Sequence, residues 1–265
     1  MSGGDLGEAC MLKFSWSCLV GWMRNSFCKK RLAEASRHIA HLVIVPDGDR
    51  RWAKEKGLPG KVGHEAMARL FPEIVDGVFC LGIHTLTLSL FSTENWDRDP
   101  KEIAYLMEIF FELIGELESI AAKHNAAIVF IGRRDRIPKK LADLQHHVED
   151  ATKDLKNHIL NIAIDYGAFD ELQRALQKIV SSCKKEDILG GQVLVADYLD
   201  TARQPHPFPD LFIRFGKVQR ISGFLPLQGS YAEFCFPPLY FPDATVQTIY
   251  RAIEEFGRRK RTFGK

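Results

Sequence analysis

Five short apolar runs alternate with longer segments of helical periodicity along this chain. The runs are HLVIV ending at Val45, TLTLSLF at 85–91, AAIVFIG at 126–132, NIAIDYG at 161–167 and LFIRFG at 211–216. Runs this short, and apolar at most positions, are typical of parallel strands that are buried on both faces. Segments 63–82 and 99–125 carry helical patterns between them. We therefore predict an α/β fold, with an open, mostly parallel sheet flanked by helices.

The chain is expected to form one domain with a short extension before it. Its 265 residues suffice for one α/β domain, and we find no linker, low-complexity tract or repeat that would divide it. We assign residues 36–265 to this domain and residues 1–35 to an N-terminal amphipathic helical extension. One helical face of the extension carries Trp16, Val20, Met23 and Phe27. Its apolar part is too short to span a bilayer, so membrane contact would be peripheral at most.

Charge and cysteine content argue against several classes of protein. The 36 basic and 34 acidic residues leave a net charge of +2, which gives no support for a nucleic-acid partner. The six cysteines lie far apart and show no CxxC or Cys/His metal spacing. This pattern favours a reducing, cytoplasmic location and argues against a zinc site.

Polar and charged residues follow three of the predicted strands. The first strand is followed by Asp47-Gly48-Asp49-Arg50-Arg51-Trp52, the second by Ser92-Thr93-Glu94-Asn95-Trp96-Asp97-Arg98, and the fifth contains Arg214 and precedes Arg220 and Ser222. Ligands of open α/β sheets bind outside the carboxyl ends of the strands. We therefore expect these side chains to form one site at that edge of the sheet.

The residue types at this edge indicate an anionic ligand. Arginine suits phosphate, because its planar guanidinium donates two parallel hydrogen bonds and keeps its charge. A diphosphate is therefore the expected guest, and Gly48 would let the backbone approach it. Asp47 would repel phosphate directly, so it fits best as a ligand of Mg²⁺ that also binds diphosphate oxygens. Alternatively, Asp47 only caps a helix and pairs with Arg50 or Arg51.

Three long segments resemble, in order, the signature regions of a known family. They are HLVIVPDGDRRWAKEKGLPGKVGHEA, LTLSLFSTENWDRDPKEI and DLFIRFGKVQRISGFLPLQGSYAEFCFPPLYFPD. They resemble the cis-prenyltransferases, the undecaprenyl diphosphate synthase family, over about residues 38–264. The resemblance implies a homodimer whose catalytic domain has a doubly wound sheet beside a hydrophobic tunnel. It also implies Mg²⁺-dependent condensation of an allylic diphosphate with isopentenyl diphosphate.

The resemblance assigns roles to individual residues. The predicted catalytic residues are Asp47, His64, Ser92 and Asn95. The predicted substrate-binding residues are Gly48, Asp49, Arg50, Arg51, Trp52, Phe91, Trp96, Arg98, Arg214, Arg220 and Ser222. The predicted metal ligands are Asp47 and Glu233, the latter reached from the metal site of the neighbouring subunit. Leu90, Leu106, Met107, Phe110, Phe111 and Ile114 are candidates for the tunnel wall, although each could equally be ordinary core.

This chain departs from the family pattern around both diphosphate sites. Asp49 replaces an asparagine, Gly60 an arginine, and Val218-Gln219 a Glu-His pair. The run Phe-Leu-Pro-Leu at 224–227 is similar to that of a small bacterial subgroup that makes branched, lavandulyl-type diphosphates by head-to-middle coupling. We favour this irregular coupling, with dimethylallyl diphosphate as acceptor. The alternatives are a regular head-to-tail polyprenyl diphosphate synthase and, last because the Asp-Gly-x-x-Arg-Trp motif is kept, a non-catalytic subunit.

Overall fold

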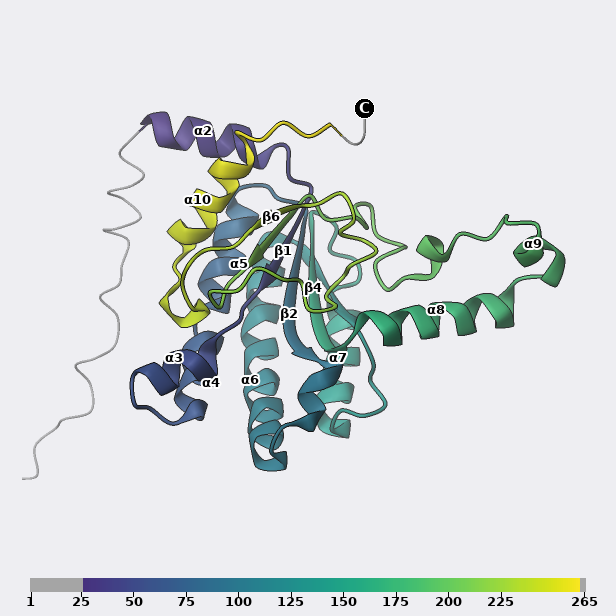
Figure 1. The fold of residues 1–265 in the computed structure, drawn as a ribbon, viewed down its shortest axis with the longest axis horizontal. Helices are drawn as coiled ribbons and strands as arrows, with labels where there is room; N and C mark the ends of the chain where they lie inside the picture. Colours follow the sequence, from purple (N-terminus) through teal and green to yellow (C-terminus); the bar gives the residue numbers. More distant parts are fainter. Residues whose placement is uncertain (1–25, 263–265) are drawn as a thin grey trace, which may run out of the picture.

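The computed structural model describes residues 26–262, and a sheet of six parallel strands forms its centre (Figure 1). The strands are β1 (His41–Val45), β2 (Thr85–Ser92), β3 (Ala126–Ile131), β4 (His158–Tyr166), β5 (Leu211–Arg214) and β6 (Glu233–Cys235). Their order across the sheet is β3-β4-β2-β1-β5-β6, and each neighbouring pair is parallel. The predicted α/β fold with an open parallel sheet is confirmed.

Helices lie in all but one of the connections between the strands, and one more helix precedes β1 and another follows β6. They are α2 (Ser26–Ser36), α3 (Asp49–Glu55), α4 (Gly60–Ala68), α5 (Phe71–Cys80), α6 (Pro100–His124), α7 (Lys139–Thr152), α8 (Ala168–Ser182), α9 (Lys185–Leu189) and α10 (Val246–Phe256). Short 3-10 turns occur at η1 (Thr93–Asp97), η2 (Val195–Tyr198) and η3 (Phe241–Asp243). The long helix α6 begins as the sequence indicates, because Asp99 caps it by accepting from the backbone N–H of Lys101 and Pro100 occupies its first turn.

Two elements differ from the sequence-based expectation. The strand β6 is not predicted, because its three residues are only half-buried and form too short a run to show a period. The helical pattern at 63–82 forms two helices, α4 and α5, with Arg69 and Leu70 between them. Pro72 lies in the first turn of α5, where its missing N–H does no harm, whereas it would interrupt a continuous helix.

Both faces of the sheet are buried, which explains the uninterrupted apolar runs. Along β1, Leu42 and Ile44 belong to a large core that includes side chains of α5, α6, α7 and α10. The alternate residues Val43 and Val45 belong to a smaller core on the other face, where they meet Phe224 of the segment after β5. Successive strand residues point to opposite faces, so only apolar side chains fit at every position.

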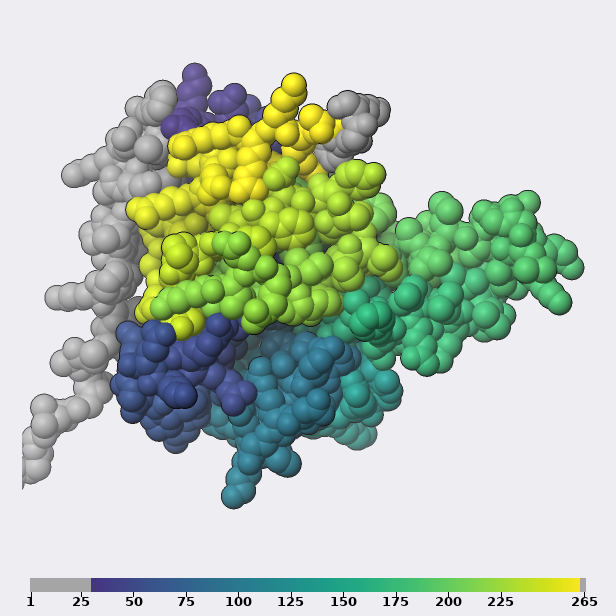
Figure 2. Space-filling view, in the orientation of Figure 1, coloured from purple at the N-terminus to yellow at the C-terminus, as the bar shows by residue number. Residues whose placement is uncertain are grey.

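Two helical segments lie at the periphery of the fold, one projecting from it and one packed on its core. The helix α8 extends away from the sheet as an arm that carries α9 (Figures 1 and 2). The helix α2 packs against α10, and its Leu32 and Ala35 join the large core. The extension proposed for residues 1–35 therefore contributes its last turns to the core, whereas Trp16, Val20, Met23 and the side chain of Phe27 lie outside the described residues. Within residues 26–262, no helix is both long and apolar enough to cross a membrane.

Candidate active site

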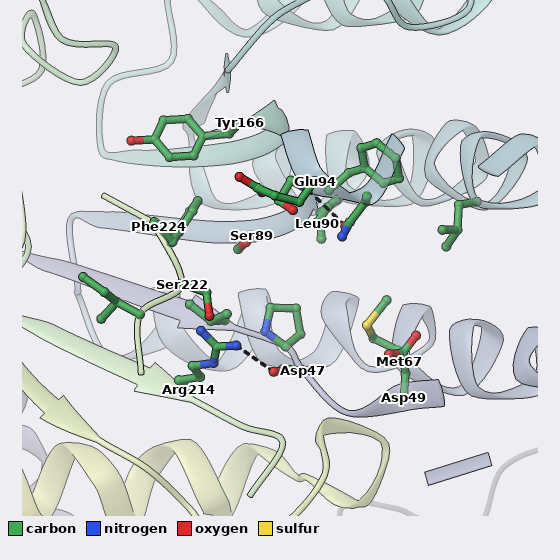
Figure 3. Close-up of a pocket in the computed structure, with 18 of the residues that line it drawn as sticks. Asp47, Asp49, Met67, Ser89, Leu90, Glu94, Tyr166, Arg214, Ser222 and Phe224 are labelled. Carbon is green, nitrogen blue, oxygen red and sulfur yellow. Dashed lines mark hydrogen bonds and ion pairs between the residues drawn. The ribbon is translucent and has the colours of Figure 1, made fainter. Parts of the chain in front are cut away.

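A cavity of about 550 Å³ opens at the carboxyl ends of β1, β2, β4 and β5 (Figure 3). Nine of the predicted site residues line it: Asp47, Asp49, His64, Phe91, Ser92, Asn95, Arg98, Arg214 and Ser222. These segments therefore meet at one edge of the sheet, as the sequence predicts. Of the predicted tunnel residues, Leu90 and Leu106 also reach the wall, and Met107, Phe110 and Ile114 are buried in the adjacent core.

Asp47 lies between two arginines at the mouth of this cavity. Its Oδ1 accepts a hydrogen bond from Nη2 of Arg51 at 2.8 Å, and its Oδ2 accepts one from Nη2 of Arg214, also at 2.8 Å. Arg214 is buried, yet within the described part of the chain its Nε and Nη1 have no hydrogen-bond partner. A buried, unpaired donor is costly. The arrangement therefore offers charged donors to an anion that enters the cavity.

A second hollow of about 380 Å³ adjoins the cavity and is strongly basic. It is lined by Asp47, Gly48, Asp49, Arg50, Arg51, Lys54 and Arg98, and it shares two carboxylates and Arg98 with the larger cavity. Four cations around two carboxylates leave an excess of positive charge. Such a surface suits a multiply charged phosphate head, whose apolar part can lie in the larger cavity.

Two glycines allow the backbone to come close at this point. Gly48 has φ of +99°, and a Cβ there would lie 2.3 Å from Cδ1 of Tyr240. Gly216 has φ of +95°, and a Cβ there would lie 2.8 Å from Nη2 of Arg51. The carbonyl of Gly216 accepts from Nη1 of Arg51 at 2.7 Å. Glycine at both positions therefore keeps the Asp47–Arg51 pair in place.

Asp49 and His64 form a closely coupled pair beside the cavity. Nδ1 of the buried His64 hydrogen-bonds to Oδ2 of Asp49. Its Nε2 lies 3.2 Å from Oε1 of Glu102, close enough for an ion pair but without the alignment of a hydrogen bond. Burial alone would raise the pKa of Asp49, but the hydrogen bond and charge of His64 outweigh it and lower this pKa. Asp49 therefore remains an anion where the family carries asparagine.

Glu102 connects this pair to the arginines. Its Oε1 lies 3.3 Å from Nη1 of Arg98 and 3.6 Å from Nε of Arg50. Glu102 is not among the predicted site residues, although an acid four residues after Arg98 is a detectable ion-pair signal. Lys54, Met67, Ser89, Glu94, Tyr166 and Phe224 also line the two hollows without having been predicted.

Ser92 at the end of β2 and Asn95 in the following turn hold each other in a fixed position. The side chain of Asn95 accepts from the backbone N–H of Ser92 at 3.1 Å, and together they form a capping box around η1. Trp96 lies behind the wall, with its ring edge-on to Phe91 and its Nε1 donating to Asp165. Trp96 therefore shapes the pocket indirectly, by fixing the position of Phe91.

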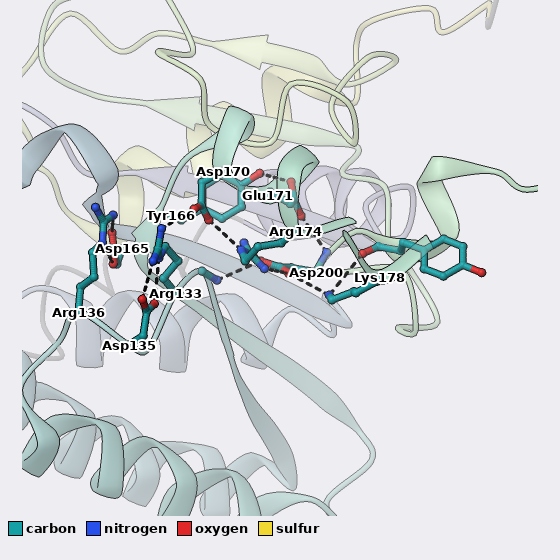
Figure 4. A network of polar contacts seen from close by, with 12 residues as sticks. Arg133, Asp135, Arg136, Asp165, Tyr166, Asp170, Glu171, Arg174, Lys178 and Asp200 are labelled. Atoms are coloured by element: carbon teal, nitrogen blue, oxygen red, sulfur yellow. Dashed lines mark hydrogen bonds and ion pairs between the residues drawn. The ribbon is translucent and has the colours of Figure 1, made fainter. Parts of the chain in front are cut away.

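The wall on the β4 side is anchored by a polar network (Figure 4). The hydroxyl of Tyr166, which lines the cavity, donates to Glu171 of α8. Glu171 also accepts from Gln228 and from the backbone of Asp200. Burial raises the pKa of both Tyr166 and Glu171. The network fixes the start of α8 relative to the cavity.

Three predicted residues lie away from the cavity within one chain. Trp52 points outward, where its Nε1 donates to Asp243. Arg220 is exposed on the segment after β5. Glu233 begins β6 in register with Leu211, at the end of the sheet opposite the cavity, and pairs with Arg259. Its predicted role at the metal site of a neighbouring subunit stays a prediction.

The donors at the cavity mouth fit a divalent cation. Mg²⁺ is usually bound by one or two carboxylates together with substrate phosphates and water. Asp47 provides a partly exposed carboxylate whose two oxygens are held by guanidinium groups, and Asp49 lies two residues away on the same rim. The remaining coordination would come from diphosphate oxygens held by the unpaired donors of Arg214.

The fold and the cavity together define an α/β protein suited to a phosphorylated molecule with an apolar tail. The family model for undecaprenyl diphosphate synthase matches residues 45–264. This chain belongs to that family, the cis-prenyltransferases. The identification rests on most of its length, and it confirms the family and the transferase class that the motifs indicate.

Individual relatives span nearly the same length. An isoprenyl transferase of Aquifex pyrophilus is 39% identical over 225 residues, covering 85% of this chain and 95% of that protein. A tritrans,polycis-undecaprenyl-diphosphate synthase of Pyrococcus abyssi, described as specific for geranylgeranyl diphosphate, is 35% identical and covers 85% and 86%. The crystal structure of lavandulyl diphosphate synthase from Lavandula x intermedia with dimethylallyl diphosphate matches with a TM-score of 0.80 and 27% identity, covering 86% and 98%.

Proposed function

We propose that this protein condenses an allylic diphosphate with a second isoprenoid diphosphate. The observation that carries the proposal is Asp47 held between Arg51 and Arg214 at the mouth of a cavity whose walls include Leu90, Phe91 and Leu106. In the reaction, the allylic carbon–oxygen bond breaks and a carbon–carbon bond forms to the acceptor. Diphosphate and one proton leave.

The residues of the site act on the leaving diphosphate. Cleavage places additional negative charge on its oxygens, and donors aimed at that charge in advance lower the barrier. Arg51, Arg98 and Arg214 are positioned to bind these oxygens. Asp47 would hold Mg²⁺, which when bound neutralises part of the diphosphate charge. Asn95, held at the wall by Ser92, would contact the part of the substrate near the reacting carbons.

The apolar wall binds the hydrocarbon part and excludes water. Each buried CH₂ group contributes about 0.8 kcal/mol, so one isoprene unit is worth roughly 3 to 4 kcal/mol. Phe91 packs edge-on against Trp96 and Phe110, which holds this part of the wall rigid. Because this apolar wall excludes water, it also protects the allylic cation from capture by water.

Within this reaction we favour irregular, head-to-middle coupling with dimethylallyl diphosphate as acceptor. Two observations support it: the similarity to the lavandulyl diphosphate synthase structure, and Phe224, the first residue of the Phe-Leu-Pro-Leu run, on the cavity wall. The competing candidate is regular head-to-tail coupling with isopentenyl diphosphate. The similarity to isoprenyl transferases and to the Pyrococcus synthase favours that candidate.

Product analysis separates these possibilities. The purified chain is incubated with Mg²⁺ and dimethylallyl diphosphate alone, and separately with isopentenyl diphosphate plus a dimethylallyl, geranyl or farnesyl donor. Mass spectrometry and NMR then identify the products. A branched product from dimethylallyl diphosphate alone supports irregular coupling, whereas linear products that require isopentenyl diphosphate reject it and support regular coupling. If no product forms under any condition, the proposed function is overturned and the non-catalytic subunit is supported.

We also propose that the protein acts as a homodimer through α8. This helix exposes a row of apolar residues, among them Phe169, Leu176 and Val180, of which Phe169 is 89% and Val180 75% exposed. Exposed apolar residues at helical spacing are typical of an interface. The dimer would bring Glu233 to the metal site of the partner. Location in the cytoplasm, with at most peripheral membrane contact, remains the inference drawn from the cysteines and the N-terminal segment.

A further inference from the structure

We propose that Asp76, Cys80 and His124 form a zinc-binding site that joins the ends of α5 and α6. One ligand atom from each residue lies within 4.8 Å of the other two. The three are distant from the cavity, because Cys80 ends α5 just before β2 and His124 ends α6 just before β3. They therefore lie near the amino ends of the strands, at the opposite edge of the sheet. The proposal is independent of the proposed prenyl transfer.

The backbone places these three ligands on facing surfaces. Asp76 and Cys80 are four residues apart on α5, so they lie on one face of that helix. His124 approaches from the neighbouring helix, and its ring packs against Phe79 and His158 at centroid distances of 5.7 and 6.2 Å. This packing limits rotation of the imidazole. A thiol, an imidazole and a carboxylate are thus held close together by two rigid helices.

A cation already lies at this position. Lys123 and His124 both contact Oδ1 of Asp76, the lysine Nζ at 2.5 Å and the imidazole Nε2 at 2.7 Å. Both helices end here, and the negative end of a helix dipole favours positive charge. The side chain of Lys123 is 61% exposed, so its ammonium can move into solvent when another cation takes its place.

The set of ligand atoms selects the metal. Sulfur and nitrogen donors favour Zn²⁺, whereas Mg²⁺ and Ca²⁺ prefer oxygen. The thiolate, and not the thiol, is the form of cysteine that binds a metal. Binding therefore releases the thiol proton to solvent, and the metal takes the place of the hydrogen that His124 shares with Asp76. One Zn²⁺ with one thiolate and one carboxylate is neutral, and the exposed side leaves room for a water as fourth ligand.

The competing interpretation is a plain ion-pair cluster of Asp76 with Lys123 and His124. The two interpretations differ at Lys123. If a metal binds, the lysine competes with it, so Lys123→Gln should tighten zinc binding. If the cluster is only an ion pair, the same change should weaken the contact between the helices and create no metal affinity.

The test uses the full chain, freed of metal and kept reduced, with excess Mg²⁺ to fill oxygen sites. Zn²⁺ is titrated by calorimetry, and Co²⁺ is used as a spectroscopic probe of thiolate coordination. We expect one equivalent of Zn²⁺ to bind, a sulfur-to-cobalt charge-transfer band to appear, and the midpoint of thermal unfolding to rise. Cys80→Ser should remove the band and weaken binding at least tenfold, about 1.4 kcal/mol. Cys183→Ser, on the distant α8 arm, is the matched control.

Two outcomes overturn the proposal. One is the lack of a charge-transfer band in the native chain. The other is a band that persists in Cys80→Ser, since it would then come from another cysteine. Circular dichroism of each variant confirms that it is folded, so that lost binding is not lost structure.

Discussion

Nη2 of Arg214 donates to Oδ2 of Asp47 at 2.8 Å, although the two residues are 167 positions apart in the chain. β1 and β5 are neighbours, and Val45 is in register with Arg214, so their carboxyl ends meet. Asp47 also accepts a hydrogen bond from Arg51, which lies four residues later in the chain. The carboxylate thus joins a cationic group of β5 to one of α3, the helix that follows β1.

Asp47→Asn should lower kcat by roughly 10²- to 10³-fold, the typical effect of losing one group that stabilises the charge of a transition state. The amide keeps the size of the side chain but removes the charge that faces Arg51 and Arg214. Steady-state kinetics at saturating Mg²⁺ measure the effect. Asp154→Asn, on an exposed turn, is the control and should keep native rates. Equal rates for native and Asp47→Asn proteins would contradict the proposed role.

Arg51→Gln should weaken binding of inorganic diphosphate by about ten- to a hundredfold, which corresponds to roughly 1.4 to 2.8 kcal/mol. The reason is the loss of a charge-assisted donor that Gly216 and Asp47 hold in place. Calorimetry with diphosphate and Mg²⁺ measures the affinity. Arg69→Gln is the matched control, because the side chain of Arg69, directly after α4, is 79% exposed. Comparable losses in both variants would show a general charge effect.

Gly48→Ala should destabilise the fold by roughly 3 kcal/mol and abolish activity, because it adds both backbone strain and a clash with the Tyr240 ring. Gly57→Ala separates the two causes. Gly57 also has positive φ, of +67°, but its Cβ would meet open space, so about 1 kcal/mol is expected. Urea unfolding measures both. If the two variants lose the same stability, the contact with Tyr240 is unimportant.

The stability of the protein should fall as the pH drops from about 6.5 to about 4, because of His41. Nδ1 of this buried residue donates to the carbonyl of His206, and its Nε2 accepts from Thr87. Burial lowers the pKa of His41 from 6.5 to about 4. Between these values the unfolded chain binds a proton that the folded chain rejects, so stability falls with pH and the loss levels off below pH 4.

The full loss from His41 amounts to about 3 kcal/mol. Urea unfolding across this pH range measures it. His41→Gln should be less stable at pH 7 but should show a shallower decline toward pH 4. A decline as steep as that of the native protein would assign the effect to other groups.

Val180→Lys should convert the proposed dimer into a monomer, since it places a charge in the apolar row of α8. Sedimentation velocity measures the mass in solution. Leu58→Lys is the control, because Leu58 is also exposed but lies near α3, away from the arm. If native protein is monomeric, or if Val180→Lys remains dimeric, α8 is not the interface.

Much of this site could be predicted because its residues lie at the carboxyl ends of strands or directly after them. The chemistry of Asp47, Ser92 and Arg214 depends on short segments whose apolar runs already indicate parallel strands, and parallel strands share one carboxyl edge. The pairing of Asp47 with Arg51 is likewise local, at a spacing of four residues. The fold class, the family and the gathering of charged groups at one edge were therefore open to prediction from sequence alone.

Tertiary structure alone decided which side chains face one another. Glu102 reaches His64 from another helix, Tyr166 and Phe224 enter the cavity wall, and Trp52 turns outward to Asp243. Asp76 and Cys80 meet His124 only because α5 packs on α6, so a search for local metal spacing overlooks them. The physical reason is range: periodicity and turn residues specify an element from its neighbours in sequence, whereas contacts between elements depend on how the whole core packs.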